Sequence, residues 1–89
     1  MEVKVLLADD HAVLREGMRQ LLEREPDIKV IGEASDGEEA VKLVSELEPA
    51  VVLMDIVMPK LTGIEATRQI KQLNPISTLI CYPLLPNCG

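Results

Sequence analysis

The stretch VVLMD, residues 51–55, decides the fold of this 89-residue chain. Its four apolar residues follow one another without a polar interruption, which is typical of a strand buried on both faces in a parallel sheet. Working outward, runs of similar character occupy residues 3–8 and 28–34, and residues 77–81 form a candidate fourth strand. Gly32, inside the second of these runs, predicts a bulge.

Between these runs, the spacing of apolar residues changes to that of amphipathic helices. The predicted apolar faces are Leu14, Met18, Leu21 and Leu22 in the first helix, Ala40, Leu43, Val44 and Leu47 in the second, and Ala66, Ile70 and Leu73 in the third. A proline ends each helix, at positions 26, 49 and 75. Asp36 with Glu39, and Thr62 with Glu65, have the spacing of capping boxes, in which the acidic residue reaches back to the cap.

Strands and helices therefore alternate in the order βαβαβαβ. Short right-handed units of this kind build a parallel sheet with helices on both faces. We expect an α/β fold whose parallel sheet has about four strands. Residues 1–75 hold three complete strand–helix units, whereas residues 76–89 hold the fourth strand and a tail without a charged residue.

Charge and composition narrow the class of partner. Fifteen acidic and nine basic residues give a net charge of −6, which argues against nucleic acid and favours a cation or a basic protein surface. No apolar run approaches the roughly 18 residues of a membrane span, and the acidic start lacks the features of a signal peptide. We therefore expect a cytoplasmic protein that does not bind membranes. Cys81 and Cys88 both lie in the tail and are interpreted as free thiols.

The candidate site lies at the carboxyl ends of the predicted strands. The first strand ends at Asp9 and Asp10 and the third at Asp55, so three carboxylates converge if these strands are neighbours. A single Asp at such a place often caps a turn or a helix. Three of them without an adjacent basic residue favour a site for a hard divalent cation such as Mg²⁺. A carboxylate beside such an ion can attack phosphorus and form an aspartyl phosphate.

His11 directly follows the acidic pair. A lone histidine in this position is more often a loop or helix-entry residue than a metal ligand or a phosphotransfer group. We interpret His11 as a helix-entry residue.

Three segments resemble the receiver domain of bacterial response regulators, and their residues are most like those of the NarL/FixJ subfamily. They are LADDH (residues 7–11), GEASDGEEA (32–40) and DIVMPKLTGIE (55–65). Together they occur in the order and at the spacing of that family, which makes the resemblance specific. It implies a flavodoxin-like fold and a module of two-component signalling whose parent protein regulates transcription.

The resemblance also implies roles for individual residues. Asp55 would accept a phosphoryl group from a sensor histidine kinase. Mg²⁺, or another divalent cation, would be held by Asp10 and Asp55 directly, by Asp9 partly through water, and by the backbone carbonyl of Val57. Pro59 and Gly63 would shape the loop after the acceptor, although both also suit an ordinary turn.

The chain departs from the family's pattern near its end. The family has a Ser or Thr hydroxyl at the end of the fourth strand and a Lys at the end of a fifth, but residues 82–84 read Tyr-Pro-Leu and no match for either switch residue is found. We therefore expect a C-terminally truncated, incomplete receiver fold whose exposed sheet edge favours self-association.

Two functions stay open for such a chain. The first is a phospho-acceptor module, not an enzyme beyond its own phosphorylation and dephosphorylation, which would reach DNA only through an output domain that this chain lacks. The second is a truncated, signalling-inactive interaction or dimerisation module that keeps the receiver half-fold.

Overall fold

The computed structural model describes residues 2–55, 63–74 and 78–82. Strands and helices alternate as predicted, in the order β1 (Val3–Ala8), α1 (Ala12–Glu23), β2 (Ile28–Ala34), α2 (Gly37–Leu47), β3 (Val51–Asp55), α3 (Gly63–Leu73) and β4 (Thr78–Tyr82). The α/β class is thereby confirmed. The capping box predicted at Thr62 lies outside the described residues.

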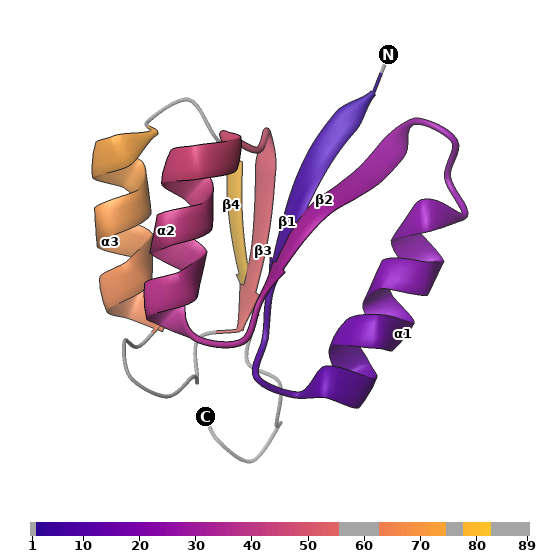
Figure 1. The fold of residues 1–89 in the computed structure, drawn as a ribbon, viewed down its shortest axis with the longest axis horizontal. Coiled ribbons are helices and arrows are strands. Elements are labelled where there is room, and N and C mark those ends of the chain that lie inside the picture. Colours follow the sequence, from indigo (N-terminus) through magenta and orange to yellow (C-terminus); the bar gives the residue numbers. More distant parts are fainter. Residues whose placement is uncertain (1, 56–62, 75–77, 83–89) are drawn as a thin grey trace.

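The four strands form one parallel sheet in the order β2-β1-β3-β4. The chain moves from β1 outward to β2, and then returns past β1 to build β3 and β4 on the other side. Figure 1 shows α1 on one face of the sheet and α2 with α3 on the opposite face. Because the winding reverses between β1 and β3, a crevice is expected where these two strands end.

A bulge in β2 confirms the prediction made for Gly32. Val5 pairs with Val30 and Leu6 pairs with Gly32, so Ile31 is the extra residue. A Cβ atom added to Gly32 would lie 2.8 Å from Leu47 Cδ1 and 3.0 Å from Leu6 Cδ1. The glycine therefore lets α2 pack closely over the bulged strand.

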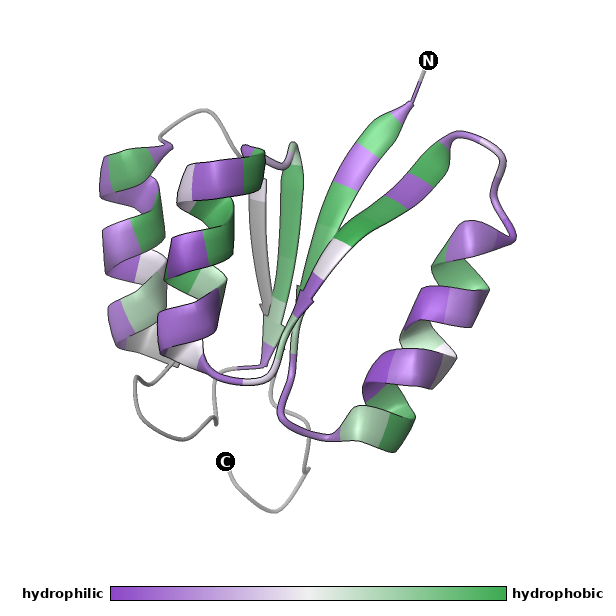
Figure 2. Cartoon of the chain, in the orientation of Figure 1, coloured by the Kyte–Doolittle hydropathy of each residue, from purple (hydrophilic) through white to green (hydrophobic). Residues whose placement is uncertain are grey.

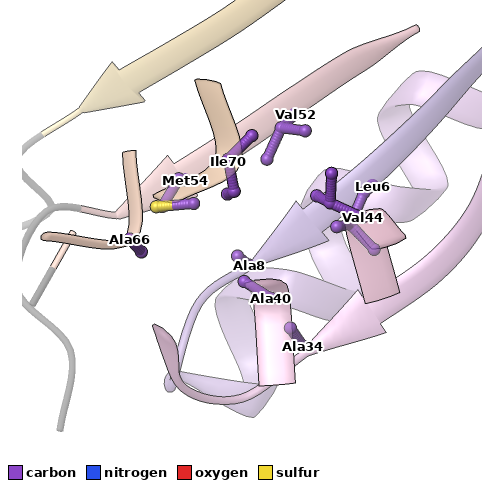
Figure 3. Packing of buried hydrophobic residues seen from close by; sticks show 9 residues of the cluster. All are labelled: Leu6, Ala8, Ala34, Ala40, Val44, Val52, Met54, Ala66 and Ile70. Carbon is purple, nitrogen blue, oxygen red and sulfur yellow. The ribbon is translucent and has the colours of Figure 1, made fainter. Parts of the chain in front are cut away.

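The core lies between the sheet and the helix pair α2 and α3. Its buried members are Leu6 and Ala8 of β1, Ala34 of β2, Ala40 and Val44 of α2, Val52 and Met54 of β3, and Ala66 and Ile70 of α3 (Figure 3). The core members of β1 and β3 have even numbers because alternate residues of a strand face the same side. Figure 2 shows the matching pattern, with continuous hydrophobic colour along β3 and mixed colours along the helices.

Both ends of α2 follow from local sequence. Asp36 Oδ1 accepts the backbone N–H of Glu39 at 2.8 Å, which confirms the predicted cap. The Glu39 carboxylate reaches back one residue further than predicted, because it accepts the backbone N–H of Ser35 at 2.7 Å. At the other end Glu48 has a left-handed backbone with φ of 48°, and the buried Pro49 follows.

Helix α1 is held less firmly than the other two. None of its 12 residues, all of which the structure describes, is fully buried. Leu21 was predicted to belong to the apolar face, but its exposed fraction is 62%. The apolar face is narrower than predicted, because α1 packs mainly against β2 and touches β1 less. Within the described ranges, no helix is long and apolar enough to cross a membrane.

Candidate functional site

The three carboxylates expected at the strand ends do come together. Asp9 directly follows β1, Asp55 is the last residue of β3, and the two strands pair in parallel with Ala8 opposite Met54. Asp9 and Asp55 are buried, whereas the side chain of Asp10 is 33% exposed. Two of the three clustered carboxylates are thus buried, and the third is partly open to solvent.

Backbone hydrogen bonds hold Asp9 firmly in this position. Its backbone N–H donates to the carbonyl oxygen of Ala34 at 2.9 Å, which extends the pairing of β1 with β2. Its side-chain Oδ1 accepts the backbone N–H of His11 at 2.8 Å, as in an Asx turn. The carboxylate is therefore oriented by the main chain on which α1 begins.

The ring of His11 lies among the carboxylates, a contact that the sequence reading missed. His11 is the N-cap residue of α1, which confirms its interpretation as a helix-entry residue. Its Nδ1 lies 2.9 Å from Asp9 Oδ1, 3.0 Å from Asp10 Oδ1 and 3.8 Å from Asp55 Oδ2. The hydrogen bond to Asp9 is the main cause that raises the pKa of His11; desolvation opposes it, and the negative charges of Asp10, Asp9 and Asp55 add to it.

Arg15 ties α1 to the same strand ends. Its Nη1 donates to the backbone carbonyl of Asp9 at 2.6 Å, and its Nε donates to Glu33 Oε1 of β2 at 2.9 Å. Arg19, one turn further along the helix, reaches the other oxygen of Glu33 at 3.3 Å. These contacts were not predicted, since the sequence pattern shows the two arginines only as polar positions between the apolar ones.

Replacing Arg15 with Met should lower the free energy of unfolding by about 1–2 kcal/mol, because a partly buried carboxylate and a backbone carbonyl lose a charged donor. Met keeps most of the apolar length of the side chain. Urea unfolding measures the loss, and Arg19→Met is the matched control, since Arg19 is more exposed and its side-chain contacts with the described residues are to carboxylates. Equal losses in both variants would contradict a special role of Arg15.

The oxygen-rich ligand set fits a hard divalent cation. Asp9, Asp10, His11 and Asp55 each offer one ligand atom, and these atoms lie within 4.8 Å of one another. Carboxylate oxygens in such a group suit Mg²⁺. Val57 and Pro59, which were also predicted to serve this site, lie outside the described residues, and Gly63 is the first residue of α3.

The register of the sheet also shows where β4 ends. Tyr82, the last residue of β4, pairs with Asp55. The end of β4 therefore lies beside the end of β3. This is the position at which the family's Ser or Thr hydroxyl is expected. The residues that follow Tyr82 are outside the described part of the chain.

Comparison with known proteins gives a consistent result. Residues 5–82 match the response regulator receiver domain. The chain is 59% identical over 68 residues to the transcriptional regulatory protein LiaR of Bacillus subtilis, a match that covers 76% of this chain and 32% of LiaR. A similar match to the transcriptional regulatory protein YdfI of the same organism has 48% identity over 81 residues and covers 89% of this chain and 38% of YdfI. The chain thus spans about a third of the length of these relatives.

Solved structures agree on the fold. The response regulator domain of Thermotoga maritima CheB superposes with a TM-score of 0.88 at 42% identity, covering 91% of this chain and 60% of that one. A LuxR-family two-component response regulator from Aurantimonas superposes with a TM-score of 0.89 at 39% identity, covering 96% of this chain and 61% of that one. The parallel sheet, the three clustered carboxylates and the match over residues 5–82 together lead to one conclusion: the chain belongs to the response regulator receiver domain family, as its resemblance to NarL/FixJ regulators indicated.

Proposed function

We propose that Asp55 accepts a phosphoryl group from a sensor histidine kinase, in the presence of Mg²⁺ or another divalent cation. The observation that supports this most directly is the position of Asp55, a buried carboxylate at the end of β3 that clusters with the carboxylates of Asp9 and Asp10. A nucleophile there is fixed by its strand, and Asp9 and Asp10 supply further oxygen ligands.

The reaction would be a displacement at phosphorus. An oxygen of Asp55 forms a bond to phosphorus while the bond between phosphorus and the donor's leaving atom breaks, so the product is an acyl phosphate on the protein. The cation, when bound, neutralises charge on the transferred phosphoryl oxygens. Asp10 and Asp55 would hold the cation directly and Asp9 partly through water. The carbonyl of Val57 is a further proposed ligand, and Pro59 and Gly63 would shape the loop after Asp55.

Phosphorylation by a small acyl-phosphate donor tests this function without the unidentified kinase. With Mg²⁺ present, intact-mass measurement should show one added phosphoryl group on the unmodified chain and none on Asp55→Asn. Asp36→Asn is the matched control, because it removes the same charge at a helix cap that Asn also forms well. An unmodified chain that gains no mass would contradict the proposal and favour the second function, an interaction module that keeps the fold without the chemistry.

We also propose self-association and a cytoplasmic role in the control of transcription. LiaR and YdfI are transcriptional regulators, and their matched segments resemble this chain. The net charge of −6 opposes direct binding to DNA, so a DNA-binding part would have to act together with the receiver.

Among the described strands, β4 pairs only with β3, and an edge strand of this kind offers its backbone to a second copy. Light scattering that shows only monomer at every accessible concentration would contradict self-association.

A further inference from the structure

The candidate cation site contains one nitrogen group among its carboxylates. Among the described residues, the group of possible ligands consists of Asp9, Asp10, His11 and Asp55, and His11 is the single histidine of the whole chain. Carboxylates alone make a site for Mg²⁺, Ca²⁺ or Mn²⁺, whereas imidazole is a preferred ligand of Ni²⁺, Zn²⁺ and Cu²⁺. The identity of this fourth group therefore bears on which ions the site holds.

The ring nitrogen has the spacing of a neighbouring ligand. In a six-coordinate site with bonds of about 2.1 Å, adjacent ligand atoms lie about 3.0 Å apart. His11 Nδ1 lies 2.9 Å from Asp9 Oδ1 and 3.0 Å from Asp10 Oδ1. Without an ion these are the distances of a hydrogen bond and an ion pair, so an ion bound to the two oxygens would displace the proton of Nδ1 to solvent and then find the nitrogen at the distance of a third ligand.

The main chain keeps His11 in this place. Its backbone N–H donates to Asp9 Oδ1, and its carbonyl oxygen accepts the N–H of Arg15 at 2.9 Å as α1 begins. The side chain itself makes no capping hydrogen bond to the helix. The ring is therefore carried by an ordered turn, and removing it does not remove a helix cap.

We propose that His11 is a ligand of the proposed cation site and raises its affinity for first-row divalent ions that bind imidazole, with Ni²⁺ and Co²⁺ as the representative ions. This inference rests on the cation site of the proposed function, but it concerns which ion binds there and by which atoms. Mg²⁺ would depend on the carboxylates, while Ni²⁺ and Co²⁺ would use the carboxylates and the ring together.

Titration calorimetry with NiCl₂ and with MgCl₂ tests the assignment. All variants carry Cys81→Ala and Cys88→Ala, because thiolates bind the same ions. His11→Ala should weaken Ni²⁺ binding by more than about a hundredfold, because the loss of an outer-sphere group that only supports a ligand already costs about ten- to a hundredfold, and it should change Mg²⁺ binding by much less. Asp55→Asn should weaken the binding of both ions, which places them in one site.

Proton NMR with Co²⁺ gives a second reading that does not depend on affinity. Since the chain has a single histidine, a strongly shifted ring signal that appears with Co²⁺ and is absent from His11→Ala identifies the ligand directly. A ring that supported the site only by its charge or its packing would show through-space shifts from the nearby Co²⁺, but not the much larger contact shift that is transmitted through a metal–nitrogen bond.

The outcomes separate the two proposals. If Mg²⁺ binds but His11→Ala changes Ni²⁺ and Mg²⁺ affinity equally, or if Asp55→Asn leaves Ni²⁺ binding intact, the inference about His11 is overturned. If Mg²⁺ fails to bind while Ni²⁺ binding still depends on His11 and Asp55, the inference stands and the Mg²⁺-dependent function is the one contradicted.

Discussion

Replacing Asp55 with Asn should stabilise the metal-free protein and abolish the further stabilisation that Mg²⁺ provides. Asp55 and Asp9 are both buried, and with Asp10 they form a cluster of three carboxylates beside a single imidazole, that of His11. Like charges at this separation disfavour one another, and Asn keeps the shape of the side chain without the charge. We expect a gain of about 1–2 kcal/mol in the free energy of unfolding, which for a domain of this size is roughly 4 °C or more in Tm.

Mg²⁺ should reverse this order of stability. At a free concentration one hundred times its Kd, a ligand stabilises the folded state by about 2.7 kcal/mol, and a variant that has lost the site gains none of it. Thermal unfolding of both proteins, in EDTA and in excess Mg²⁺, measures the two effects together. Asp36→Asn serves as the control for a simple change in net charge. A variant that is no more stable than the unmodified chain in EDTA, or that Mg²⁺ stabilises equally, would contradict the assigned position of the ion.

Replacing Ile70 with Ala should lower the free energy of unfolding by about 2–5 kcal/mol, the range for removing a large buried aliphatic side chain. Ile70 is 0% exposed and belongs to the cluster that joins α3 to β1, β3 and α2. Figure 3 shows its side chain near Val52 and Met54. A small domain has little stability in reserve, so a loss of this size would leave a substantial unfolded fraction at room temperature.

Leu73, three residues further along the same helix, provides the comparison. Its exposed fraction is 53%, so Leu73→Ala should cost well under 1 kcal/mol by urea unfolding. Equal losses for the two variants would show that α3 does not pack on the sheet through Ile70 in solution.

The fold could be predicted almost entirely from the sequence, because each strand and helix carries its own periodic signal. The apolar run of β3 and the spacing of Ala66 and Ile70 both reflect burial on the side where the structure places it. Leu21 and Leu73 were misplaced for a related reason, since both are more than half exposed: periodicity identifies the apolar stripe of a helix, but not how much of that stripe its neighbours cover. Coverage depends on where α1 lies over the sheet, which no local pattern contains.

The candidate site was predictable only in part. That Asp9 and Asp55 meet follows from two strand ends and the parallel sheet. The contact of the His11 ring with Asp9 and Asp10 depends on a tight turn at residues 9–11. The hydrogen bond from Arg15 to Glu33 depends on the rotation of α1 about its axis. Two signals could have indicated them, namely the histidine directly after two carboxylates that need a counter-charge, and a glutamate near the end of β2. The roles of Val57, Pro59 and Gly63 stay predictions.

The incomplete burial of α1 has a consequence for local unfolding of the protein. Opening free energies differ along a chain, and a helix without a fully buried residue should detach locally long before the whole domain unfolds. The amide protons of α1 should therefore exchange with solvent at a higher rate than those of α2, whose Ala40 and Val44 are buried in the core. Because Arg15 lies in this helix and His11 is the residue from which it begins, detachment of the helix would pull Arg15 away from Asp9 and loosen the turn that holds His11. An ion bound by the carboxylate cluster would oppose this motion, so amide exchange along α1 should become slower when the ion binds.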